Sequence, residues 1–265
     1  MTDRTRVQYR LDGHVAVITL DDPPANTYSH EMMRQLDDCI LRARFDPAVQ
    51  VIVLTAAGEK FFCAGANIAM LEQADPVWKY NFCLHANETL SRLEQTPKLV
   101  VAAVNGHCVG GGLEVAMACD LRVARKGCGK VGLPEVALGV LPGTGGTQRL
   151  ARLVGKSKAM MLMIEGANFT PDEALAQGIL DKVLDVPAGE FVGAVVAWAK
   201  GFTTPTKAAM AVGHIKRSVQ TGAELPLEYG LAFERELQAK LFASADAKEG
   251  LAAYNQKRAA RFEGR

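Results

Sequence analysis

The stretch Leu99–Asp120 reads LVVAAVNGHCVGGGLEVAMACD, and it decides the class of fold. Its first six residues, Leu99–Val104, are all apolar, which predicts a strand that is buried on both faces of a sheet. Asn105-Gly106 is a turn signal that ends this strand. Three consecutive glycines, Gly110–Gly112, then begin a short helix. A buried strand, a turn and a glycine-rich helix start in succession are typical of an α/β protein.

The same strand pattern recurs on both sides of this stretch. Apolar runs predict further strands at Val15–Thr19, Val51–Leu54, Leu121–Ala124 and near Leu180–Val183. Helical spacing of apolar residues separates some of them, as between the predicted N-cap Ser29 and Ala43, and between Pro76 and Leu93. Strands that alternate with helices about every 40 to 50 residues predict parallel pairing in an α/β fold.

The C-terminal part of the chain has a different pattern. Thr170-Pro171 predicts a helix start with proline at the first helical position. Further helices are expected at residues 187–200, 204–219, 224–241 and 244–258, with no long strand among them. We therefore expect a core at residues 1–200 and a mostly helical region at residues 201–265, without a linker that would separate independent domains.

The composition narrows the function classes. The chain has 265 residues with 30 Lys plus Arg and 29 Asp plus Glu, so its formal net charge at pH 7 is +1. This balance gives no electrostatic reason to expect nucleic acid or an anionic membrane surface as the main partner. The most apolar segment contains Asn105, His107 and Glu114, which is poor material for a membrane helix, and no secretory signal is expected. We expect a soluble, cytoplasmic protein.

The cysteine and histidine residues indicate neither disulfides nor a metal centre. None of the six cysteines is paired at C-x-x-C spacing, and most have apolar or small neighbours, so we expect reduced, buried thiols. His85 and His107 have no second ligand at metal-binding spacing, so we expect no metal site.

Two glycine-rich segments, Gly106–Gly112 and Gly139–Gly146, are the unusual feature of the sequence. Neither continues into the Lys-Ser/Thr of a phosphate loop, and neither matches a dinucleotide-binding G-x-G-x-x-G motif. A helix that starts near Gly111 presents unpaired N–H groups and the positive end of its dipole, and glycine lets a substrate oxygen approach them. Glu114, one turn into this helix, would lie beside the bound group. The alternative is close packing between helices, with Glu114 in solvent.

Two further segments complete the candidate site. Phe61–Ile68, FFCAGANI, is similar to a second strand-to-helix transition with accessible backbone N–H groups. Two such turns that converge would form an oxyanion hole, in which two donors bind one carbonyl oxygen. Gly132–Gln148 places Glu135 among Pro, Val and Leu residues. Burial there disfavours the charged form of a carboxyl group, which suits acid–base catalysis.

Together these segments resemble the enoyl-CoA hydratase/isomerase (crotonase) superfamily, and most closely its two-glutamate hydratases. The stretches that carry the resemblance are Phe62–Ile68, Asn105–Asp120, Pro134–Gln148 and the tail Glu249–Arg265. The resemblance implies a crotonase-like spiral of ββα turns with a helical C-terminal region. It also implies an acyl-CoA substrate, homotrimers that often pair into hexamers, and no cofactor, because coenzyme A is part of the substrate.

The resemblance also implies roles for individual residues. The backbone N–H groups of Ala66 and Gly111 would be the oxyanion donors, Glu114 would activate water, and Glu135 would protonate C2. The residues expected to contact the CoA and acyl parts of the substrate are Ala25, Ala64, Gly65, Asn67, Ile68, Gly143, Lys257 and Phe262.

The sequence departs from the family pattern in the part that binds CoA. Asn67 stands where many members have Asp, and Ala69 stands where a lysine often contacts a CoA phosphate. The turn Pro23–Asn26 is one residue shorter than the common form. Arginines or Lys257, in the same subunit or a neighbouring one, would then bind the phosphates.

The expected function is hydration of a 2-enoyl-CoA to a 3-hydroxyacyl-CoA, or the reverse reaction. One alternative is an enoyl-CoA delta-isomerase, which needs mainly one carboxylate, or another crotonase-type acyl-CoA enzyme. A second is a non-catalytic CoA- or RNA-binding protein of the same fold. The presence of both Glu114 and Glu135 and the near-neutral net charge argue against the second alternative.

Overall fold

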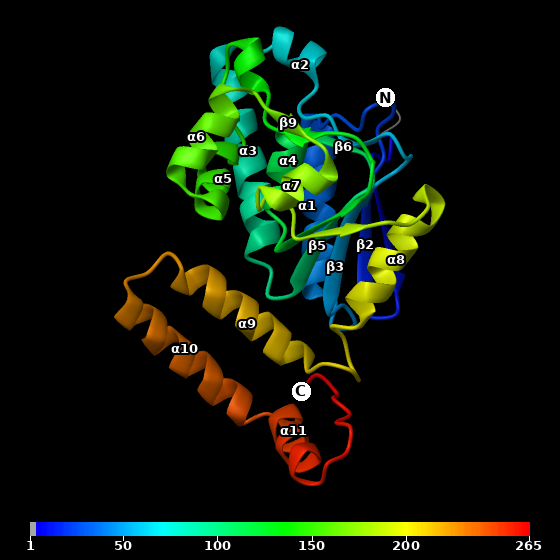
Figure 1. Ribbon diagram of the computed structural model, residues 1–265, viewed down its shortest axis with the longest axis vertical. Helices are drawn as coiled ribbons and strands as arrows, with labels where there is room; N and C mark the ends of the chain where they lie inside the picture. Colours follow the sequence, from blue (N-terminus) through cyan, green and yellow to red (C-terminus); the bar gives the residue numbers. More distant parts are fainter. Residues whose placement is uncertain (1–3) are drawn as a thin grey trace.

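A six-stranded sheet lies at the centre of the computed structural model, which describes residues 4–265 (Figure 1). Adjacent strands pair in parallel, except for the antiparallel pair at one edge. This confirms the predicted α/β class. The order across the sheet is β1 (Val7–Asp12), β2 (Val15–Leu20), β3 (Val51–Ala56), β5 (Leu99–Val104), β7 (Leu121–Arg125) and β10 (Lys182–Leu184).

The central strands are buried on both faces, and their side chains alternate between two core regions. Val51 and Val53 of β3 pack with apolar residues of α8 (Ala188–Lys200), whereas Ile52 and Leu54 belong to the larger core on the opposite face. All six residues of β3 are buried, which explains the uninterrupted apolar run in the sequence. The larger core is covered by α1 (His30–Phe45) and α3 (Pro76–Glu94), and Ser29 caps α1 as predicted.

A second, four-stranded sheet carries the glycine-rich turns. Its strands have only two or three residues each, too few to show a periodic pattern in the sequence. Because β4 and β6 are parallel neighbours, the turns that follow them leave the same edge of the sheet. The order is β4 (Phe61–Cys63), β6 (His107–Val109), β8 (Val131–Gly132) and β9 (Asn168–Phe169).

The two sheets are built by a repeated ββα connection. In each unit one strand joins the large sheet, the next joins the small sheet, and a helix follows. Strands β3 and β4 lead to α2 (Ile68–Glu72), β5 and β6 lead to α4 (Gly111–Met117), and β7 and β8 lead to the 3₁₀-helix η1 (Glu135–Leu138). This spiral confirms the expected crotonase-like architecture.

The remaining helices follow the spiral. After α5 (Gly146–Val154) and α6 (Lys156–Ile164), α7 (Pro171–Ala176) begins with Pro171 at its first position, as predicted, and Thr170 forms a capping box with Glu173. The helix expected from residue 204 begins at Ala209 instead. Residues 203–207 form turns, in which the N–H groups of Thr206 and Lys207 donate to the Thr203 carbonyl. None of the helices within residues 4–265 has the length and apolar character that crossing a membrane requires.

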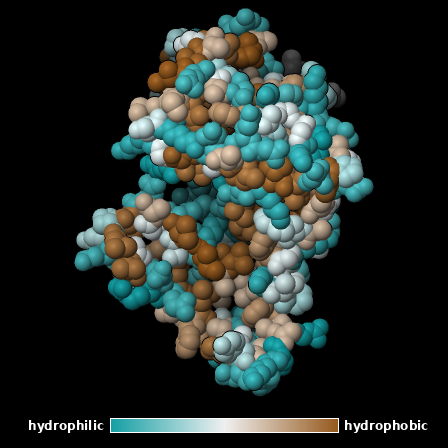
Figure 2. Space-filling model, viewed as in Figure 1, coloured by the Kyte–Doolittle hydropathy of each residue, from teal (hydrophilic) through white to brown (hydrophobic). Residues whose placement is uncertain are grey.

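The last three helices form an arm that extends away from the two sheets (Figure 1). The arm consists of α9 (Ala209–Gly222), α10 (Leu227–Phe242) and α11 (Ala245–Asn255). It is joined to the core by a buried ion pair between Lys216 and Asp120, at 2.9 Å. Figure 2 shows hydrophobic surface on the arm, and Leu237 is the buried residue of α10.

The start of α4 lies closer to its neighbours than any side chain would allow. A Cβ atom on Gly112 would lie 2.0 Å from the carbonyl oxygen of Cys63, and one on Gly111 would lie 2.3 Å from the Tyr28 hydroxyl. Glycine at both positions therefore lets the N-terminus of α4 pack against the end of β4.

We predict that Gly112→Ala destabilises the fold by about 3 kcal/mol or more, because the new methyl group meets backbone that cannot rotate away. The matched control is Gly193→Ala in α8, where a Cβ meets no atom within 4 Å and alanine should stabilise the helix by about 0.5–1 kcal/mol. Urea unfolding at a fixed protein concentration measures both. Equal stability of the two variants would contradict the packing of α4.

Candidate active site

The turn after β4 and the turn after β6 lie against each other. The Tyr28 N–H donates to the Gly65 carbonyl at 2.9 Å, and the Asn67 N–H donates to the Tyr28 carbonyl at 3.1 Å. These two bonds fix Ala66 between them, paired in parallel with Tyr28. A Cβ atom on Gly65 would lie 3.1 Å from the backbone nitrogen of Gly111. The structure therefore brings together the two turns that the sequence analysis expected to converge.

Both turns offer free hydrogen-bond donors. Among residues 4–265, the backbone N–H groups of Ala66 and Gly111 have no acceptor. Gly111 is the first residue of α4, where an N–H group has no partner within its own helix. Ala66 lies between the two bonded residues of its turn, and its own N–H takes no part in them. Two unpaired donors on adjacent turns form an arrangement that can bind one carbonyl oxygen.

Glu114 is the first of two carboxyl groups near these donors. Its side chain is only 2% exposed, so the alternative that places it in solvent is wrong. Its Oε1 accepts hydrogen bonds from the backbone N–H groups of Thr144, at 2.8 Å, and Gly146, at 2.7 Å. Its Oε2 accepts a hydrogen bond from the Thr144 hydroxyl. Three donors therefore hold both oxygens of this carboxyl group in place.

Glu135 is the second carboxyl group, and it has the opposite environment. Its Oε1 lies 3.3 Å from the position that a Cβ on Gly110 would take, so it faces the start of α4. Its Oε2 is buried and has no hydrogen-bond partner within residues 4–265. Burial raises the pKa of Glu135 from 4.5 to about 7; its own backbone N–H opposes this shift, and the charge of Glu114 adds to it. At neutral pH, Glu135 is therefore protonated in a large fraction of the molecules.

Sequence reasoning missed Tyr28 and Thr144, which connect the site to the aromatic core. The Tyr28 hydroxyl is 3.0 Å from the Thr144 hydroxyl. The Tyr28 ring stacks on Phe82 with centroids 5.9 Å apart, and Phe82 stacks on Trp78 at 5.3 Å. Burial raises the pKa of Tyr28 well above 10, so this hydroxyl stays protonated. No local signal distinguishes Tyr28 from an ordinary core residue, because its partner lies more than a hundred positions away in the sequence.

Several residues expected to contact substrate lie around the two turns. The Ala25 carbonyl accepts a hydrogen bond from the Ala64 N–H at 3.1 Å, which places the Pro23–Asn26 turn beside β4. Asn67 also caps α2, because its side chain accepts from the Met70 N–H at 3.0 Å. Ile68 is half-exposed next to it. Gly143 precedes Thr144, and a Cβ there would lie 3.5 Å from the Cys83 sulfur.

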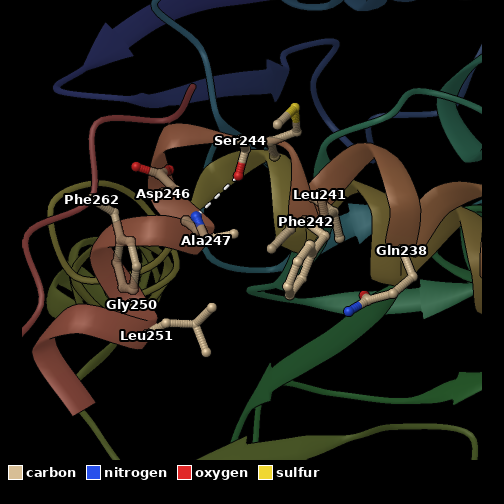
Figure 3. A pocket seen from close by; sticks show the side chains of 12 residues that line it. Gln238, Leu241, Phe242, Ser244, Asp246, Ala247, Gly250, Leu251 and Phe262 are labelled. Carbon is tan, nitrogen blue, oxygen red and sulfur yellow. Dashed lines mark hydrogen bonds between the residues drawn. The ribbon is translucent and has the colours of Figure 1, made fainter. Parts of the chain in front are cut away.

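Lys257 and Phe262 do not lie near the other candidate residues in this chain. Lys257 is exposed just after α11, and Figure 1 shows α11 at the end of the arm, far from α4. Phe262 lines a pocket of about 350 Å³ between the helices of the arm. Figure 3 shows its ring against Gly250, beside Leu251. A single chain therefore assembles the carboxyl groups and the N–H donors, but not the C-terminal contacts.

The cysteine residues of the site are not activated. All six cysteines are free, and burial raises the pKa of the Cys63 thiol to about 12. Within residues 4–265 no cluster of three or more His, Cys, Asp or Glu side chains has the arrangement of a metal site.

Comparison with known proteins identifies the family of the chain. The family model for enoyl-CoA hydratase/isomerase matches residues 10–265. The chain is 37% identical to the short-chain-enoyl-CoA hydratase of Clostridium acetobutylicum, over 93% of each protein. It is 41% identical to a probable enoyl-CoA hydratase of Rhizobium meliloti, over 96% of each. The crystal structure of an enoyl-CoA hydratase from Geobacillus kaustophilus superimposes with a TM-score of 0.95, at 42% identity, over 100% of this chain and 98% of that one. The chain belongs to the enoyl-CoA hydratase/isomerase family.

Proposed function

We propose that this protein is an enoyl-CoA hydratase, which adds water reversibly across the C2–C3 double bond of a 2-enoyl-CoA. The observation that carries the proposal is the pairing of two carboxyl groups of opposite character beside two free N–H donors. One carboxyl group is surrounded by donors and the other is buried with an elevated pKa. Relatives named as enoyl-CoA hydratases, at 37% and 41% identity, support the same reaction.

In this proposal the thioester carbonyl oxygen accepts hydrogen bonds from Ala66 and Gly111. Withdrawal of electron density toward this oxygen makes C3 electrophilic and stabilises the enolate that forms. Glu114 takes a proton from a water molecule as the water oxygen bonds to C3. Glu135 then gives its proton to C2 of the enolate, and the carbonyl is restored. Water adds as a proton and a hydroxyl group, and exchange of one proton between the two glutamates completes the cycle.

The elevated pKa of Glu135 limits the pH range in which hydration is fast. In hydration Glu135 must begin protonated, and this form is lost as the pH rises through about 7. Glu135 therefore supplies the alkaline limb of the rate of hydration, and Glu114, which must begin ionised, supplies the acidic limb. Dehydration needs the same single proton on Glu114 instead of Glu135, so it has the same two pH limits, and the equilibrium, which exchanges no net proton, does not change with pH.

The same proposal covers substrate binding, cofactors and location. The CoA and acyl path would be lined by Ala25, Ala64, Gly65, Asn67, Ile68 and Gly143. The arm of a neighbouring copy would supply Lys257 and Phe262.

No metal or redox cofactor is required, because the backbone N–H groups polarise the thioester. The free cysteines support a reducing compartment such as the cytoplasm.

We further propose that the protein assembles as a homotrimer or a dimer of trimers through the region 201–265. The support is the apolar surface of the arm, which stays exposed in the part of the chain that the structure describes, residues 4–265 (Figure 2). Large exposed apolar surfaces mark sites of association. The exposed apolar residues of the arm include Ile215, Val219, Leu227, Tyr229, Leu231, Phe242, Leu251 and Tyr254.

For the reaction, we predict that Glu114→Gln and Glu135→Gln each lower kcat for crotonyl-CoA hydration by about 10²–10⁴, because glutamine keeps the shape but cannot exchange the proton. The double variant should lose much less than the product, since the two groups act on one substrate. Kinetics with crotonyl-CoA and with a 3-enoyl-CoA measure hydration and isomerisation. An isomerase would show one severe and one mild variant, and near-full hydration by Glu114→Gln would refute the mechanism.

For the assembly, we predict that light scattering at micromolar concentration gives a mass of three or six chains. Phe242→Glu places a charge on the arm, where the side chain is 64% exposed, and should reduce the mass. The matched control is Phe45→Glu, at the 79% exposed end of α1, which should not. A monomeric wild-type protein would overturn the proposal.

A further inference from the structure

A chain of two hydroxyl groups ends on Glu114. The Tyr28 hydroxyl lies 3.0 Å from the Thr144 hydroxyl, and the Thr144 hydroxyl donates to Oε2 of Glu114. All three side chains are buried, with exposed fractions of 3%, 2% and 2%. These hydrogen bonds join the turn before α1, the loop before α5 and the helix α4, which are distant from one another in the sequence.

Counting the hydroxyl protons shows which group donates each bond of this hydrogen-bond chain. A threonine hydroxyl has a single proton, and Thr144 gives that proton to Glu114. The contact between Tyr28 and Thr144 is therefore a hydrogen bond that Tyr28 donates. Tyr28 can do so over the whole working pH range, because its hydroxyl stays protonated. A donated bond from Tyr28 also polarises the Thr144 hydroxyl and strengthens its bond to the carboxylate.

The hydrogen-bond chain acts on the oxygen of Glu114 that keeps a free acceptor position. A carboxylate has about four acceptor positions, two on each oxygen. On Glu114 the backbone N–H groups of Thr144 and Gly146 occupy both positions of Oε1. The Thr144 hydroxyl occupies one position of Oε2, which leaves the other for the proton of the attacking water.

We propose that Tyr28 and Thr144 are positioning residues for Glu114, which hold its Oε2 aimed at the attacking water. The proposal rests on the proposed hydratase function for the identity of the water, but the hydrogen-bond chain itself does not. Without the Thr144 hydroxyl, the carboxylate would keep both bonds at Oε1 and could pivot about them.

The other titratable groups around Glu114 are few. Glu135 and Cys63 are coupled to it electrostatically, and Cys63 is a protonated thiol. Arg149 of α5 contacts the Thr144 carbonyl at 3.4 Å, although its ion pair is with Glu94. Within residues 4–265 no cation therefore forms an ion pair with Glu114. The Glu114 carboxyl group is held by hydrogen bonds instead.

The test compares Thr144→Val, Thr144→Ser and Tyr28→Phe in crotonyl-CoA hydration across pH. Valine keeps the shape of threonine without the donor, so Thr144→Val should lower kcat by about ten- to a hundredfold, the effect of a hydrogen bond to a charged group. KM should change less than about twofold, because no ground-state contact to substrate is removed.

The acidic limb of the pH profile of hydration should move to higher pH, since loss of a donor disfavours the ionised base. Thr144→Ser should restore both properties, and Tyr28→Phe should lower kcat by about two- to tenfold in the same sense.

Two matched controls separate positioning from stability. Thr55→Val removes a buried hydroxyl that donates to the Ala103 carbonyl, and Tyr9→Phe removes a buried hydroxyl without a partner within residues 4–265. Both should leave the pH profile unchanged. A Thr144→Val enzyme that behaves like Thr55→Val, or a Thr144→Ser enzyme as impaired as Thr144→Val, would overturn the proposal. A Tyr28→Phe enzyme that matches Tyr9→Phe would overturn the part assigned to Tyr28.

A second readout works without turnover. In protein labelled with ¹³C at glutamate carboxyl carbons, the Glu114 signal is identified by its loss in Glu114→Gln. Its titration midpoint should move to higher pH in Thr144→Val and stay unchanged in Thr55→Val. If wild-type protein fails to hydrate crotonyl-CoA, the proposed function falls and this titration still decides the positioning roles. An unmoved midpoint in Thr144→Val would overturn them.

Discussion

The site depends on the contact between the N-terminus of α4 and the turn after β4. A Cβ on Gly112 would overlap the Cys63 carbonyl oxygen, and a Cβ on Gly65 would lie 3.1 Å from the Gly111 nitrogen. This contact brings two unpaired N–H groups together and directs Glu114 toward the loop before α5. The parallel pairing of β4 and β6 makes the contact possible, because both turns leave the same edge of the small sheet.

The same framework gives two glutamates different properties. Glu114 lies inside α4, where the loop before α5 surrounds it with backbone and hydroxyl donors. Glu135 lies in an apolar segment, and one of its oxygens has no partner within residues 4–265, so burial raises its pKa to about 7. Two carboxyl groups of one chemical type thus have the contrasting surroundings that the base and the acid of the proposed reaction require. Backbone geometry, rather than a rare side chain, produces this difference.

The sequence predicted the features that are encoded locally. The apolar runs of β2, β3, β5 and β7 located the parallel sheet, because strands buried on both faces have no polar alternation. The glycines before Glu114 and the apolar neighbours of Glu135 indicated the candidate site.

Strand β1 was not predicted, since its half-exposed sequence mixes polar and apolar residues. The short strands β4, β6, β8 and β9 were missed too, because two or three residues show no periodicity. The bond between Tyr28 and Thr144 depends on how the whole chain folds.

The central claim is that Ala66 and Gly111 polarise the thioester carbonyl of a bound acyl-CoA. Infrared spectroscopy tests it with butanoyl-CoA that carries ¹³C at the carbonyl carbon, since this saturated thioester binds without being hydrated. Two donors on one oxygen weaken the carbonyl bond, so its stretching frequency should be lower on the protein than in water. A frequency equal to or higher than that of the free thioester in water, for the fully bound ligand, would contradict the account.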